Sequence, residues 1–197
     1  MISNKRNLDR HTEIIEKAGK IFKRHGYRKT TIEDIAKACG LGKTALYHYF
    51  PSKEAIFVEV VRVESAEMLR KVSQSVDAVS DPREKLLALT KTRLKVISEI
   101  MAEITEKKTG EEIIGLLPSV ARVRQQFFDK EANLLQSILE EGQRQGVFKS
   151  FSSNYVPVLM IAAIRGVELH CAQLQPAPSL NTAINLMMKL FFEGICV

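Results

Sequence analysis

The chain has 197 residues, of which 45% are apolar and 26% are charged, a composition typical of a globular protein large enough to bury a core without disulfides or metals. Its longest apolar run, Tyr155 to Ile164, has ten residues, whereas a membrane-spanning helix needs about 20. The amino terminus lacks the apolar stretch of a secretory signal, and the three cysteines show no CxxC spacing. We therefore expect a cytoplasmic protein without a membrane partner, a bound metal or a cofactor.

Helical periodicity runs through the whole chain, and no segment shows the sustained alternation of apolar and polar residues that indicates a strand. The pattern predicts an all-α fold. The expected helices cover approximately residues 14–25, 31–39, 43–50, 53–78, 82–104, 119–144, 154–174 and 180–192.

Two of these helix ends carry clear local signals. Gly26 suits the left-handed position that follows a helix, so the first helix is expected to end there. The second helix is expected to begin with a capping box, formed either by Thr30 with Glu33 or, as a weaker match, by Thr31 with Asp34.

Residues 32–46 have the spacing of a helix-turn-helix. Counting Ile32 as position one, position five is Ala36, position nine is Gly40 and position fifteen is Leu46. The fifth side chain must be small because two helices cross closely there, and the turn needs a positive φ, which glycine adopts without strain. The fifteenth must be apolar because it packs back on the first helix, so all three requirements are met.

The positive charge is concentrated at the start of the chain. Residues 1–53 contain 12 Lys and Arg against 5 Asp and Glu, whereas residues 54–197 contain 17 against 18. Such asymmetry points to a polyanion as the partner of the first segment. Because the composition changes near Pro51 and Ser52, we expect a three-helix domain over residues 1–52 and a second helical domain over residues 53–197.

The second helix of this helix-turn-helix has two faces. Leu46 and Phe50 are four residues apart and are expected to point inward. The other face carries Lys43, Thr44, Tyr47 and His48. These side chains can donate to base edges or to phosphates near a helix amino terminus, the end that normally enters the major groove.

Three further residues are candidates for DNA contact. Thr31 and Lys53 begin the flanking helices, where backbone N–H groups favour an anion such as phosphate. Tyr49 fits either a DNA contact or a core aromatic with a solvated hydroxyl, and the second interpretation is favoured for one of Tyr47 and Tyr49.

The strings at residues 31–36, 40–41, 45–50 and 52–54 resemble the DNA-binding domain of the TetR family of bacterial regulators, over about residues 10–60. The resemblance implies an all-α homodimer that binds a palindromic double-stranded DNA operator through its first domain. It also implies that the second domain binds a small-molecule effector, which usually releases the DNA, and that the last two helices form a four-helix dimer interface.

One position departs from the family pattern. The residue before the recognition helix is usually Ser or similar, where it caps the helix, but here it is Gly42. Losing the side-chain cap to glycine costs only a few tenths of a kcal/mol. It also removes one possible phosphate contact, which leaves more of that task to Lys43 and Thr44.

The second domain is expected, by analogy with the family, to hold a mostly apolar effector pocket. Its candidate lining residues are Ile97, Met101, Ile104, Phe127 and Leu135, each of which also fits ordinary core packing. Arg165 interrupts an apolar helix and either binds an anionic ligand or, as we favour, forms an ion pair with Glu168 or with an acid of a partner subunit.

The sequence thus predicts a homodimeric, ligand-responsive transcriptional repressor, released from its operator by a hydrophobic or amphipathic molecule. No nucleophile motif such as GxSxG is present, so an enzyme is not expected. The alternative is a helical dimeric protein or enzyme that binds a small molecule but has no sequence-specific DNA binding. An activator is indistinguishable from a repressor at this level.

Overall fold

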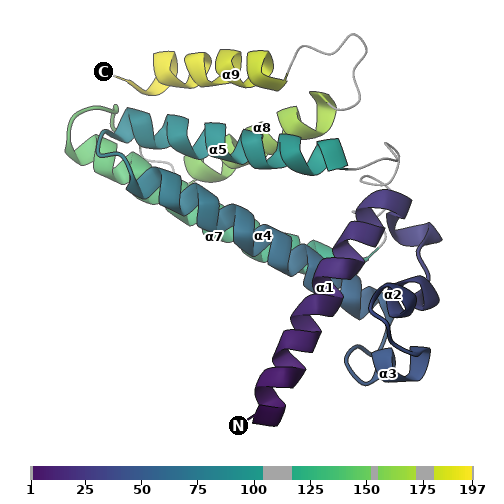
Figure 1. Ribbon diagram of the computed structural model, residues 1–197. Helices are drawn as coiled ribbons and strands as arrows, with labels where there is room; N and C mark the ends of the chain where they lie inside the picture. Colours follow the sequence, from purple (N-terminus) through teal and green to yellow (C-terminus); the bar gives the residue numbers. More distant parts are fainter. Residues whose placement is uncertain (1, 104–116, 152–154, 172–179, 197) are drawn as a thin grey trace. The chain divides into compact units, whose positions relative to one another are not determined.

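The structure, a computed structural model, describes the backbone of residues 2–103, 117–151, 155–171 and 180–196 and the side chains of residues 7–100, 117–151, 155–166 and 182–196. Figure 1 shows the helices along the chain. They are α1 (Ile2–Lys29), α2 (Ile32–Ala38), α3 (Lys43–Tyr47), α4 (Lys53–Asp77), α5 (Pro82–Glu103), α7 (Pro118–Arg144), α8 (Val156–Cys171) and α9 (Leu180–Ile195).

The expected all-α fold is confirmed. Within the described ranges the only β pairing is an isolated antiparallel bridge between Phe148 and Cys196. No helix in this part of the chain combines the length and the apolar character needed to cross a membrane. Two compact units form, one from Met1–Ser65 with Ile100–Gln125 and one from Ala66–Glu99 with Gln126–Val197. The domain boundary expected at residues 52 and 53 remains a prediction.

The first unit contains a small core made by the three N-terminal helices and the start of α4. Its fully buried side chains include Ile14 of α1, Ile35 of α2, Leu46 of α3 and Ile56 of α4. Helix α1 begins earlier than expected. At Gly26 the backbone leaves the helical conformation, with a φ of 75° and a ψ of 162°, so the helix is interrupted where the sequence indicates its end, and a short helical segment follows up to Lys29.

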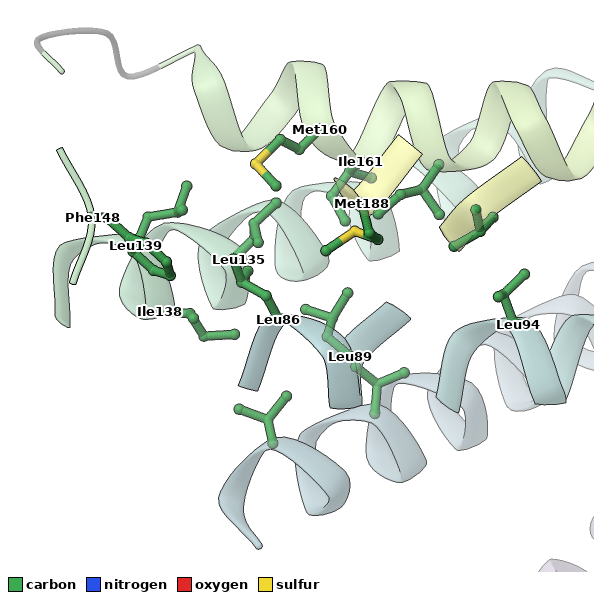
Figure 2. Packing of buried hydrophobic residues seen from close by; sticks show 14 residues of the cluster. Leu86, Leu89, Leu94, Leu135, Ile138, Leu139, Phe148, Met160, Ile161 and Met188 are labelled. Carbon is green, nitrogen blue, oxygen red and sulfur yellow. The ribbon is translucent and has the colours of Figure 1, made fainter. Parts of the chain in front are cut away.

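The second unit has a larger core, which Figure 2 shows from close by. Leucines and isoleucines of α5 and α7 meet methionines and isoleucines of α8 and α9 in this cluster (Figure 2). Its labelled members are Leu86, Leu89, Leu94, Leu135, Ile138, Leu139, Phe148, Met160, Ile161 and Met188. Spacings of three and four residues along each helix place these side chains on one face.

The carboxyl end of α7 turns sharply so that Phe148 enters this core. Gly146 has a φ of 70°, and the N–H groups of Gly146 and Val147 donate to the carbonyls of Gln143 and Gly142, at 3.1 and 2.8 Å. This is the Schellman pattern that ends helices at a glycine. The Phe148 ring then lies against Gly142, and a Cβ built on Gly142 would overlap the ring.

We expect the substitution Gly142→Ala to destabilise the protein by about 1–3 kcal/mol, the usual cost of overpacking a core, because the Phe148 ring must move. Urea unfolding followed by circular dichroism measures this free energy. Gly194→Ala is the matched control, since no atom lies near its added Cβ and alanine favours the helix. Equal stability of the two variants would contradict the assigned packing.

Candidate functional site

The α2–turn–α3 segment has the geometry that its spacing predicts. Gly40 adopts a φ of 64°, and the N–H of Leu41 donates to the carbonyl of Ala36 at 2.9 Å, which closes the turn. Ala36 is 3% exposed and Leu46 is fully buried. The small residue, the positive φ and the inward leucine therefore act together as a helix-turn-helix.

The capping box at the start of α2 is formed by the pair that the sequence matched less well. Thr31 accepts from the N–H of Asp34 at 3.1 Å, and the Asp34 carboxylate accepts from the N–H and the hydroxyl of Thr31. These hydrogen bonds from Thr31 lower the pKa of Asp34. Thr30 is buried instead and donates its hydroxyl to the Gly26 carbonyl at 2.7 Å, so its capping role with Glu33 was wrong.

Helix α3 is shorter than expected. It ends at Tyr47 rather than near residue 50, because the N–H groups of His48 and Tyr49 donate three residues back, to Ala45 and Leu46. Its N-cap is Gly42, which makes no side-chain hydrogen bond, as the sequence indicates. Phe50 is 3% exposed and points inward as expected.

The outward face of α3 carries polar side chains in solvent. The exposed members are Lys43, Thr44, Tyr47 and His48, and Thr31 at the start of α2 is also exposed. Tyr49 is partly buried against the N-terminal core, so of the two tyrosines it is the one that joins the core. Five of the seven candidate DNA-contacting residues are thus exposed to solvent. Their contact with DNA remains a prediction.

Lys43 is engaged within the protein. Its ammonium pairs with the Glu33 carboxylate of α2, which raises the pKa of Lys43 and lowers that of Glu33. Both side chains are more than half exposed. Exposed pairs of this kind contribute little to stability, so a phosphate or a base can take the place of Glu33.

Lys53, at the start of α4, has a structural task that the sequence did not indicate. Its ammonium donates to the backbone carbonyls of Tyr27 and Thr30, both at 2.8 Å, and lies 4.3 Å from the centre of the Tyr27 ring. Partial burial lowers the pKa of Lys53. Because an ammonium has three N–H donors, one remains for a phosphate.

A buried charged cluster lies in the second unit. The two oxygens of Glu131 on α7 accept from Arg93 of α5 and Arg165 of α8, the latter at 2.8 Å. Glu131 and Arg93 are each 3% exposed. Arg165 therefore forms an ion pair, as favoured, but with Glu131 of its own chain, and the side chain of Glu168 lies outside the described residues.

Glu131 and Arg93 are not among the residues predicted from the sequence, although a signal for both exists. Glu131 follows Phe127 by four residues and precedes Leu135 by four, so it occupies the apolar stripe of α7. Arg93 lies four residues after Leu89 in the stripe of α5. A charged residue inside an apolar stripe indicates a buried ion pair.

The residues predicted to line the effector pocket differ in how deeply they are buried. Leu135 is 1% exposed within the C-terminal core, Phe127 is 7% exposed with the Lys130 ammonium 4.9 Å from its ring centre, and Ile97 is partly buried. The side chain of Met101 and the whole of Ile104 lie outside the described residues. Contact of any of these residues with an effector remains a prediction.

Comparison with known proteins agrees with this geometry. Residues 14–60 match the family described as "Bacterial regulatory proteins, tetR family". The chain is 30% identical over 142 residues to the HTH-type transcriptional repressor KstR2 of Rhodococcus jostii, covering 72% of this chain and 69% of the relative. It is also 27% identical to the uncharacterized HTH-type transcriptional regulator YhgD of Bacillus subtilis, over 96% of this chain and 98% of the relative.

The fold extends the likeness to the whole chain. A putative transcriptional regulator from Saccharomonospora viridis, whose crystal structure is in complex with choline, superposes with a TM-score of 0.77 at 21% identity. The superposition covers 95% of this chain and 97% of that protein. With the helix-turn-helix geometry and the similarity to KstR2, these findings make the chain a member of the TetR family, a helix-turn-helix transcriptional regulator and not an enzyme.

Proposed function

We propose that the protein is a homodimeric repressor that binds a palindromic operator and is released from it by a small hydrophobic or amphipathic effector. The observation that carries the proposal is the exposed polar face of α3, held on a buried core within the most basic segment of the chain. The KstR2 relatives, which are named as transcriptional repressors, support repression rather than activation.

Exposed apolar side chains on α8 and α9 support the homodimer. Leu159 of α8 is 65% exposed, and Leu186 and Leu190 of α9 are 59% and 61% exposed. The two helices contact each other, and the two leucines of α9 are four residues apart on one face. Large exposed apolar side chains on two helices that contact each other are typical of an interaction surface, and a second copy of these two helices would complete a four-helix bundle.

A route for the effector signal is also available in the helices. Ser119 in the first turn of α7 donates to the Glu54 carboxylate in the first turn of α4, close in sequence to Lys53. Both helices continue from the first compact unit into the second. An effector that favours one position of these helices changes operator affinity, provided that it binds the two states with different affinities.

The central test is fluorescence anisotropy with DNA from upstream of the protein's own gene, against a scrambled duplex of equal length at 150 mM salt. We expect a dissociation constant of about 10⁻⁸ M or tighter for the specific site and about 10⁻⁴–10⁻⁶ M for the scrambled DNA. Two protomers should bind per site, because recognition helices of a dimer meet major grooves about 34 Å apart. Equal, weak binding to duplexes taken from across the genome would favour the alternative, a protein that binds a small molecule but has no sequence-specific DNA binding.

Two lysines should differ in how they affect DNA binding. Lys43→Ala is expected to weaken operator binding by about 1–3 kcal/mol while changing non-specific binding less, since Lys43 projects from the recognition helix. Lys53→Ala is expected to weaken binding to both duplexes by a similar factor, as loss of a phosphate contact does. The same titrations check both variants, with circular dichroism to confirm folding. A sequence-selective loss in Lys53→Ala would contradict its phosphate role.

The dimer surface is tested by placing charge on it. Leu186→Glu combined with Leu190→Glu should yield a monomer at micromolar concentration, because association would bury unpaired carboxylates. Sedimentation velocity measures the oligomeric state. Leu8→Glu on α1, where the leucine is 68% exposed, is the matched control and should remain dimeric. A dimer that persists in the double variant would place the interface elsewhere.

A further inference from the structure

Arg165 has an incomplete set of hydrogen bonds inside the second unit. Its Nη2 donates to Glu131 Oε2 at 2.8 Å, and its guanidinium lies 4.9 Å from the centre of the Phe128 ring. Its Nε is buried and has no hydrogen-bond partner within the described part of the chain. A buried donor without a partner is rare in native proteins, so this Nε is available to donate to a ligand.

Glu131 does not complete this set, because its two oxygens serve two arginines. Oε1 accepts from Arg93, so only Oε2 faces Arg165. Arg165 therefore forms one hydrogen bond with Glu131, whereas an arginine can bind a carboxylate through two parallel N–H groups. Arg165 is also the accessible member of the cluster, since its side chain is 30% exposed and that of Arg93 is 3% exposed.

We propose that Arg165 anchors the head group of an anionic effector, a carboxylate attached to an apolar body. This inference rests on the proposed ligand-responsive function and specifies the chemical class of its ligand. The planar guanidinium matches a carboxylate, and the Nε donor offers it a hydrogen bond that no group in the described part of the chain accepts. Phe128 offers an apolar surface to the body of the ligand. Its side chain packs against the C-terminal core, and its ring faces the guanidinium of Arg165.

Glu131 and Arg93 have a supporting role in this arrangement. Glu131 holds Arg165 in place through Nη2 and is itself held by the buried Arg93. The carboxylate of Glu131 also competes with an incoming anion for the same guanidinium. A cationic effector, by contrast, gains nothing from Arg165 and is repelled by it.

The experiment uses the full chain without DNA. Its melting temperature and its calorimetric binding are measured with decanoate below the micellar concentration, and with decanol, decyltrimethylammonium and choline as neutral and cationic probes. Decanoate is expected to raise the melting temperature and to bind at least about tenfold more tightly than the other three, because a charged hydrogen-bonded pair contributes that much.

Three variants assign the effect to Arg165. Arg165→Met should weaken decanoate binding at least about tenfold. Arg70→Met, which removes an exposed arginine paired with Glu67 in the same unit, should leave decanoate binding unchanged. Arg165→Lys should also weaken decanoate binding, since lysine keeps the charge that pairs with Glu131 but lacks the Nε donor and the planar guanidinium; this variant keeps the test valid where Arg165→Met does not fold.

The outcomes separate this inference from the proposed function. Tight decanoate binding that Arg165→Met removes and Arg70→Met retains supports the anion site. Equal binding of decanol or the cations, no binding of decanoate, or decanoate binding that survives Arg165→Met overturns it. Operator titration of the same preparations reports on the proposed function alone, because a repressor with a neutral or cationic effector would still bind its operator.

Discussion

The recognition helix depends on one constraint, the burial of Leu46. A helix of five residues is not stable alone, since helix nucleation costs more than so few hydrogen bonds return. Helix α3 exists because Leu46 is fully buried against the N-terminal core, a contribution of about 1.5–3 kcal/mol for a leucine side chain. Phe50, 3% exposed at the end of the same segment, secures its other end.

This constraint also fixes which side chains face outward. With Leu46 and Phe50 directed into the core, Lys43, Thr44 and Tyr47 are presented to solvent. A contact outside α3 then holds the flanking helices together. Lys53 joins the start of α4 to the end of α1 through two backbone carbonyls, which satisfies acceptors that a helix end leaves open. Lys53 therefore stabilises the packing of α4 against the end of α1 and also contributes positive charge.

The second unit combines an apolar core with a buried charged cluster. Charges removed from water are costly, and attraction within the pair offsets that cost only when the hydrogen bonds are complete. The shared carboxylate of Glu131 pairs with Arg93 within the core, while the Nε of Arg165 has no partner among the described residues. A cluster of this kind adds little to stability. In the anion site that we propose, it would make binding selective for the charge of the ligand.

Local sequence was sufficient for the helices and for the helix-turn-helix, because apolar spacing, a positive-φ glycine at residue 40 and the small Ala36 act within one or two turns of chain. It was also sufficient to indicate that Arg165 is paired. Only the tertiary structure decided that its partner is Glu131, 34 residues away, and that Lys53 donates to carbonyls 23 and 26 residues earlier. Such partners are chosen by how the helices pack, and no local pattern records that geometry.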